Sequence, residues 1–142
     1  MIGIALSFVL ISGATSPVDG QARARQFLEA FAANPVSAKQ FATKDAVIVV
    51  GDIGGSYDDY VKVIKSKAPD WLKACQVGQL SEKPSPTTEE LQDGPPRYLG
   101  GKISAFEGSY ACVRKNNSRS DVKLTVVLKD DLVVDLYLGV GR

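Results

Sequence analysis

The apolar positions in the first part of the chain recur at the spacing of an α-helix. From about residue 21 they form a single stripe, made by Ala24, Phe27, Leu28 and Phe31. Residues at i, i+3, i+4 and i+7 share one face of a helix, so this stripe predicts an amphipathic helix. Asn34 and Pro35 predict the end of that helix and the start of a second one, as an N-cap and a first helical residue. We expect the second helix over about residues 36–42, with Val36 and Phe41 in the core.

The pattern that follows predicts a strand, a turn and a helix in succession. The β-branched run over residues 46–50 is typical of a buried strand. The sequence Gly-Asp-Ile-Gly-Gly over residues 51–55 predicts a turn. Ser56, followed three residues later by Asp59, is close to a capping box and predicts the start of a third helix. This helix carries an apolar stripe with two phenols on it, formed by Tyr57, Tyr60, Val61 and Ile64.

Strand patterns dominate the rest of the chain. Residues 71–80 predict a strand with Trp71, Cys75 and Val77 on one face. Residues 82–96 contain several prolines and predict a long connection between strands, which we expect to pass over the mouth of a pocket. Connections of this length are usually functional or disordered, and the sequence does not decide between the two.

Three long alternating segments at the C-terminal end predict an antiparallel meander. In the first, residues 102–114, one face is expected to hold Phe106, Tyr110 and Cys112. The second covers residues 122–129. In the third, residues 132–140, Leu132, Val134, Leu136 and Leu138 are expected to oppose Val133, Asp135 and Tyr137. Both faces carry apolar residues, so the alternation does not say which face is the inner one, and the second face is available for a partner subunit.

This order of elements resembles the nuclear-transport-factor-2-like superfamily, including its SnoaL-like branch. The likeness covers about residues 21–140 and rests on residues 25–31, residues 41–47, Gly54-Gly55-Ser56 and the last strand through Val133, Asp135 and Tyr137. The resemblance implies an α+β fold: a curved mixed or antiparallel sheet wrapped around N-terminal helices, forming a cone with an internal pocket. Residues 23–142 would form this single domain.

The resemblance also guides the choice of candidate site residues. The residues expected to line a pocket are Phe27, Phe31, Tyr57, Tyr60, Trp71, Phe106, Tyr110 and Tyr137. Isomerases of the superfamily use a tyrosine of the first helix and an aspartate near the end of the first strand. Here the first helix offers Phe27 and Phe31, which have no hydroxyl, and Asp52 is displaced into the turn. Asp52 is therefore either a general base in apolar surroundings or, as we favour, a turn residue that bonds its own backbone.

Composition narrows the chemistry further. The chain has 142 residues, enough for one domain, and 17 Lys and Arg against 16 Asp and Glu give a net charge of +1. A charge this small gives no electrostatic argument for nucleic acid or for an anionic membrane, and the basic residues Arg114, Lys115 and Arg119 are expected to be a solvated hairpin end. The sequence contains no histidine, so the commonest general base and zinc ligand are missing. Adjacent acids point apart and do not predict a metal site, and no cofactor is expected.

Residues 1–22 are expected to be a signal peptide or leader. The apolar run Ile2–Ile11 is followed by Ser12-Gly13-Ala14, which suits cleavage after Ala14; a later cut after Ala22 or Ala24 is an alternative. A positive segment before the run is missing, so an uncleaved anchor or a buried element remain alternatives. Export to the periplasm or medium, with no membrane span left after processing, is the expectation.

Cys75 and Cys112 fit export, because an oxidising compartment would let them pair if their strands are neighbours. Two buried free thiols are the alternative.

These observations lead to three alternative hypotheses of function. The first is an exported domain that binds a small apolar or amphipathic ligand, or a protein partner, without catalysis. The second is a cofactor-independent isomerase, cyclase or dehydratase with Asp52 as base and a tyrosine (Tyr57, Tyr60 or Tyr110) as proton donor. The third is a dimeric assembly module that uses the outer face of the sheet; a homodimer is expected.

Overall fold

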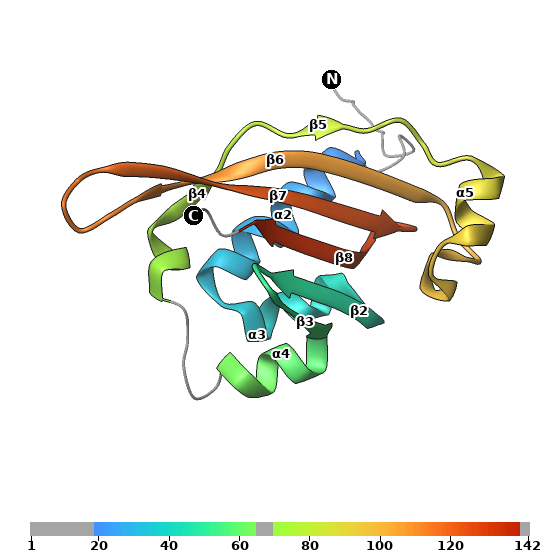
Figure 1. The fold of residues 1–142 in the computed structure, drawn as a ribbon, viewed down its shortest axis with the longest axis horizontal. Helices are drawn as coiled ribbons and strands as arrows, with labels where there is room; N and C mark the ends of the chain where they lie inside the picture. Colours follow the sequence, from blue (N-terminus) through green and yellow to red (C-terminus); the bar gives the residue numbers. More distant parts are fainter. Residues whose placement is uncertain (1–18, 65–69, 140–142) are drawn as a thin grey trace, which may run out of the picture.

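One mixed sheet organises the molecule, and helix α2 crosses its inner face (Figure 1). The computed structural model describes residues 19–64 and 70–139. The helices and helical turns are α2 (Gly20–Ala33), α3 (Pro35–Ala38), η2 (Lys39–Phe41), α4 (Tyr57–Ile64), η3 (Asp70–Ala74), α5 (Thr88–Asp93) and η4 (Pro96–Tyr98). The strands are β2 (Ala42–Val50), β3 (Ile53–Ser56), β4 (Cys75–Val77), β5 (Ser81–Glu82), β6 (Ile103–Val113), β7 (Arg119–Lys129) and β8 (Leu132–Gly139).

The helices of the first half begin where the sequence predicts. The Asp19 carboxylate accepts a hydrogen bond from Gln21 N (3.0 Å) and caps α2, and the Asn34 side chain caps α3. The apolar stripe of α2 is fully buried, as predicted. The prediction that Val36 lies in the core is wrong: Val36 is 41% exposed. Because α3 is a single turn, it presents Ala38 to the core instead.

The strand–turn–helix segment is confirmed with one change. The turn contains only Gly51 and Asp52. Residues 53–55, expected to belong to the turn, form β3 together with Ser56, and β3 pairs antiparallel with β2. Gly51 has φ +61°, a conformation that glycine adopts without steric cost. The Ser56 hydroxyl accepts a hydrogen bond from Asp59 N (3.1 Å) at the start of α4, as the capping pattern predicted.

The strand expected over residues 71–80 is shorter than predicted. Residues 70–74 form the turn η3, and only residues 75–77 pair with β6. At the end of β4, the backbone is bound by a side chain of helix α2: Arg25 donates to the carbonyls of Val77 and Gly78 (3.3 and 2.8 Å). The side chain of Trp71 lies outside the described residues.

A disulfide joins Cys75 and Cys112. The sequence left open whether these residues pair or are free thiols, and in the structure they pair. The two residues lie directly opposite each other in the β4–β6 pair, with 4.1 Å between their Cα atoms. The bond ties β4 to the adjacent long strand at one side of the sheet.

The C-terminal meander is confirmed, and β8 also pairs in parallel with β2, which makes the sheet mixed. A β-bulge corrects the predicted faces of β8. Val127 pairs with Asp135 and Leu128 with Val133, so Val134 is an extra residue. Because a bulge shifts the alternation by one residue, Val133 joins the inner core and Val134 faces the other side of the sheet.

The connection that includes α5 and η4 covers part of the outer sheet face. Ile103, Val127 and Val134 form a small buried cluster there, against which Leu91 and Tyr98 pack. The sequence predicted a long connection, and the structure shows it as an ordered cover of the outer face. Within residues 19–64 and 70–139, no helix is both long and apolar enough to cross a membrane.

Candidate functional site

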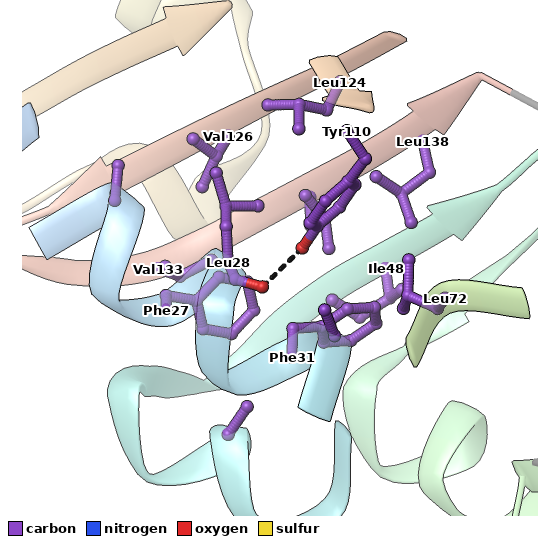
Figure 2. Close-up of a cluster of buried hydrophobic side chains, with 14 of the residues drawn as sticks. Phe27, Leu28, Phe31, Ile48, Leu72, Tyr110, Leu124, Val126, Val133 and Leu138 are labelled. Atoms are coloured by element: carbon purple, nitrogen blue, oxygen red, sulfur yellow. Dashed lines mark hydrogen bonds between the residues drawn. The ribbon is translucent and has the colours of Figure 1, made fainter. Parts of the chain in front are cut away.

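Aromatic side chains of the two longest helices meet on the inner face of the sheet. Phe27, Phe31 and Tyr57 are fully buried, and the Tyr57 ring lies edge-on to both phenylalanines, with centroids 6.1–6.2 Å apart. Tyr110 reaches the same core from β6 (Figure 2), and Phe106 of the same strand is also part of it. Five of the eight residues predicted to line a pocket are therefore brought together as one buried cluster.

Two of the buried phenols are bound to backbone carbonyls. Tyr57 donates to Pro35 O (2.8 Å). Tyr110 donates to Leu28 O (2.6 Å), as Figure 2 shows. Burial raises the pKa of both hydroxyls well above the ordinary tyrosine value. These contacts join the third turn of α2 to β6 and the start of α3 to α4, so the two phenols stabilise the fold.

Tyr60 differs from these two phenols. Its ring is half-buried and stacks on Phe31, with centroids 5.7 Å apart and planes at 24°. In the part of the chain that the structure describes, no residue forms a hydrogen bond with the Tyr60 hydroxyl. Burial raises the pKa of Tyr60, so the group is a neutral donor at physiological pH. Among the described inner tyrosines, Tyr60 is the one whose hydroxyl forms no hydrogen bond within the described residues.

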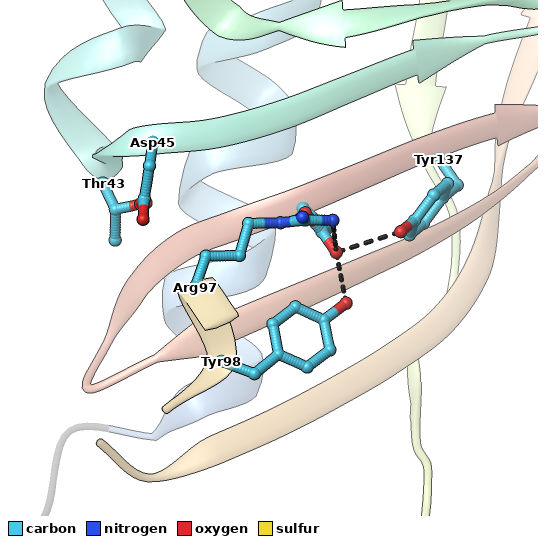
Figure 3. A network of polar contacts seen from close by, with 6 residues as sticks. Thr43, Asp45, Arg97, Tyr98 and Tyr137 are labelled. Atoms are coloured by element: carbon cyan, nitrogen blue, oxygen red, sulfur yellow. Dashed lines mark hydrogen bonds and ion pairs between the residues drawn. The ribbon is translucent and has the colours of Figure 1, made fainter. Parts of the chain in front are cut away.

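The outer face carries a group of polar side chains centred on Asp135, which is fully buried. The side chains of Arg97, Tyr98 and Tyr137 converge on its carboxylate (Figure 3). Arg97 of η4 binds both carboxylate oxygens, from Nε to Oδ1 (2.7 Å) and from Nη2 to Oδ2 (3.0 Å). Tyr98 and Tyr137 also donate to Oδ2, the latter at 3.0 Å. The bulge in β8 and the turn η4 together create this arrangement.

Four donors surround the buried Asp135 carboxylate. Three of them donate to Oδ2, and Arg97 Nε donates to Oδ1. The hydrogen bond to Asp135 is the main reason that the pKa of Arg97 is raised, and burial followed by that carboxylate raises the pKa of Tyr98 and Tyr137. The group therefore holds η4 on the sheet and is not arranged to accept a proton from a substrate.

Neither a protein-family model nor a curated protein matches the sequence. Solved structures do match. A structure named Rd1NTF2_04 with long sheet has a TM-score of 0.54 at 13% identity, over 85% of this chain and all of that one. An NTF-2 like protein of unknown function from Shewanella oneidensis MR-1 has a TM-score of 0.52 at 11% identity, over 84% of this chain and 94% of that one. The chain has the NTF2-like fold.

A protein from Sphaerobacter thermophilus matches this NTF2-like chain with a TM-score of 0.51 at 13% identity, covering 84% of the chain and 94% of that protein. The fold class predicted from the sequence is confirmed, including the mixed sheet and the helices on its inner face. At these identities the likeness establishes the fold, and the chemistry has to be argued from the residues of this chain.

In this NTF2-like domain, Asp52 lies in the exposed turn between β2 and β3. An exposed turn does not provide the apolar surroundings that the general-base interpretation requires, which favours the turn interpretation. Tyr137 lies on the outer face and is 36% exposed, so it is separated from the inner cluster by the sheet. None of the described residues form a group of three or more Cys, Asp or Glu side chains that could hold a metal ion.

The sequence did not identify Arg97 and Tyr98. Both lie in the proline-rich connection, where no periodicity marks a residue as buried. The signal that was available is Asp135 itself, a single acid within the apolar run over residues 132–140. A buried acid needs a partner, and the partner is 38 residues away.

All five tyrosines of the NTF2-like domain have a raised pKa, and this has a direct test in alkali. We expect the folded protein to show little tyrosinate absorbance at pH about 10, where a free tyrosine is half ionised. A group with a raised pKa contributes full stability below its unfolded pKa, so stability should fall as pH rises above about 10. Ultraviolet titration beside a denatured sample measures both effects; identical titration curves would contradict the burial of these phenols.

Proposed function

We propose that this chain is an exported, non-catalytic domain that binds a small amphipathic ligand on the inner side of its sheet. The observation that carries the proposal is the state of Tyr60: a half-buried ring stacked on Phe31, with a hydroxyl that no described residue binds. Ligand sites are mostly apolar, with a few polar groups that fix orientation. The partly buried Tyr60 and Val61, which pack against the buried aromatic cluster, supply the apolar surface, and the Tyr60 hydroxyl supplies the hydrogen bond.

The arrangement of the acids supports binding without catalysis. Acid–base catalysis needs a group that exchanges a proton with the substrate. Asp135 is occupied by four donors on the opposite face of the sheet, and Asp52 is exposed in a turn. The isomerase, cyclase or dehydratase alternative depends on Asp52, and full activity of an Asp52→Asn variant toward any substrate found would remove that role.

The disulfide supports export, because such bonds persist mainly in oxidising compartments. The position of the first described helix favours cleavage after Ala14. Helix α2 begins at Gly20 and is capped by Asp19, so cleavage after Ala14 leaves the helix intact. Cleavage after Ala22 would remove its first residues and its cap.

Substitution of Tyr60 tests the proposed ligand contact. The ligand is first recovered from the host compartment by native mass spectrometry, and its affinity is then measured by titration calorimetry. We expect Tyr60→Phe to weaken binding by roughly 2- to 10-fold, because one hydrogen bond of about 0.5–1.5 kcal/mol is lost. Tyr60→Ala should weaken it further, because the stacking surface is lost as well.

Tyr137→Phe is the matched control, since it removes a phenol hydroxyl from the other face of the sheet. It should leave the affinity unchanged. Equal losses in Tyr60→Phe and Tyr137→Phe, or no loss in Tyr60→Ala, would contradict the proposed position of the site.

A homodimer through the outer face is the second candidate. Tyr137 is 36% exposed, its hydroxyl is fixed by Asp135, and Val49 lies beside it in the neighbouring strand. A fixed, exposed tyrosine beside apolar residues is typical of interface centres. Sedimentation velocity should show a dimer that Tyr137→Lys converts to a monomer, while Lys44→Glu, an exposed change in β2, leaves the dimer intact. A monomeric wild-type protein at high concentration would remove this candidate.

A further inference from the structure

The net charge of +1 conceals a separation of charge along the molecule. The hairpin between β6 and β7 carries Arg114, Lys115 and Arg119, all exposed. Between residues 108 and 129 the chain contains a single acid, Asp121. The exposed acids Glu89, Glu90 and Asp93 belong to α5, which lies at the opposite end of the molecule (Figure 1).

The acidic end is too far away to cancel the field of the hairpin. Strand β6 has 11 residues and runs from the α5 end of the sheet to the hairpin. At about 3.3 Å per residue, its ends are roughly 30–35 Å apart. Exposed charges are screened over about 8–10 Å at physiological ionic strength. A surface that meets the hairpin therefore senses a net charge of about +2, from three cations and the nearby Asp121, whatever the sum over the chain.

We propose that the β6–β7 hairpin is a docking element for an anionic lipid surface, separate from the ligand site. The hairpin projects beyond the body of the molecule, so it meets a surface before the rest of the protein does (Figure 1). Its exposed residues include Val113, which is 48% exposed and lies opposite Arg119 in the ladder, and which adds apolar contact beside the cations. With the hairpin on the surface, the acidic α5 faces away from it.

A lipid surface fits this hairpin better than a single protein partner. The potential of an anionic membrane acts on all three cations without requiring a matched arrangement of acids. With a protein partner, such as the α5 acids of a second copy, the hairpin would form exposed ion pairs. Each such pair adds little binding free energy, and together they must offset the cost of association. An acidic protein partner or head-to-tail self-association is therefore an outcome that the experiment has to distinguish.

The test compares vesicles of phosphatidylglycerol and phosphatidylcholine with vesicles of phosphatidylcholine alone. The full processed chain should co-sediment with the anionic vesicles at low salt, and binding should fall as salt is raised toward about 0.15 M. Each cation near such a surface changes partitioning about fivefold, so the variant Arg114→Gln/Lys115→Gln/Arg119→Gln should lose about a hundredfold. All three side chains are exposed, and circular dichroism confirms that the variant is folded.

The matched control is Lys44→Gln/Lys62→Gln/Lys102→Gln, which removes the same charge from exposed positions outside the hairpin. It should retain most of the binding. Equal losses in the two triple variants would overturn the proposal, because net charge alone would then explain the result. Equal binding of the wild type to both kinds of vesicle would also overturn it. So would self-association, or retention of an acidic protein, without vesicle binding.

Discussion

Replacing Asp135 with alanine should lower the free energy of unfolding by about 3 kcal/mol, because Arg97 would lose its counter-charge beneath η4. The Asp135 side chain is fully buried and that of Arg97 is 21% exposed, so the guanidinium cannot simply be rehydrated in place. Tyr98 and Tyr137 would lose their shared acceptor as well. Guanidinium denaturation followed by circular dichroism measures the change.

The control for this substitution is Asp121→Ala, an exposed aspartate of the neighbouring strand β7. We expect it to change stability by no more than about 0.5 kcal/mol. Arg97→Met should destabilise the wild type far more than it destabilises Asp135→Ala, since the two residues form one unit. Equal effects of Asp135→Ala and Asp121→Ala would show that the buried ion pair does not hold η4 on the sheet.

Removing the disulfide should lower the free energy of unfolding by roughly 3–4 kcal/mol. The bond closes a loop between residues separated by 37 positions, and this constraint restricts the unfolded chain. The double variant Cys75→Ala/Cys112→Ala should therefore unfold at lower denaturant concentration than the oxidised wild type. Both sulfur atoms lie in nearly buried residues, so part of the loss comes from packing.

Adding a reductant distinguishes the contribution of the disulfide bond to stability from that of side-chain packing. The wild type should lose stability when dithiothreitol is added, and the double alanine variant should not respond. Unchanged stability of the wild type under reduction, with both thiols then alkylated, would mean that the cross-link contributes nothing to the fold.

Local sequence patterns were sufficient to predict the first helices and the C-terminal meander. The stripe of α2, the caps at Asn34 and Ser56 and the alternation of β6 and β7 each depend on residues a few positions apart, so the sequence records them directly. The same patterns carried the resemblance that the solved structures confirm at the level of the fold.

The errors arose where distant residues decide the local structure. β4 is shorter than predicted because residues 70–74 form η3, and at its end the carbonyls of residues 77 and 78 are bound by Arg25, more than 50 positions away. The faces of β8 were misassigned at Val134, because alternation assumes an unbroken strand and cannot reveal a bulge. The Asp135 group joins a proline-rich connection to the last strand, and no spacing rule connects the two.

The proposed ligand site was likewise predictable in part from the sequence. The sequence identified the aromatic residues of the inner cluster, since stripes on α2 and α4 mark them as inward-facing. It could not separate Tyr57 and Tyr110, whose hydroxyls bind Pro35 and Leu28, from Tyr60, whose hydroxyl has no described partner. That distinction depends on backbone carbonyls brought close by the fold.

The most direct test of ligand binding on the inner face is a chemical-shift map. The isotopically labelled, processed chain is titrated with a small-molecule extract of its native compartment, and backbone amide shifts are followed by nuclear magnetic resonance. The proposed function predicts saturable shifts at the C-terminal half of α2 and in α4, around Phe31 and Tyr60. Shifts confined to the outer face around Tyr137, or a spectrum that the extract leaves unchanged, would contradict it.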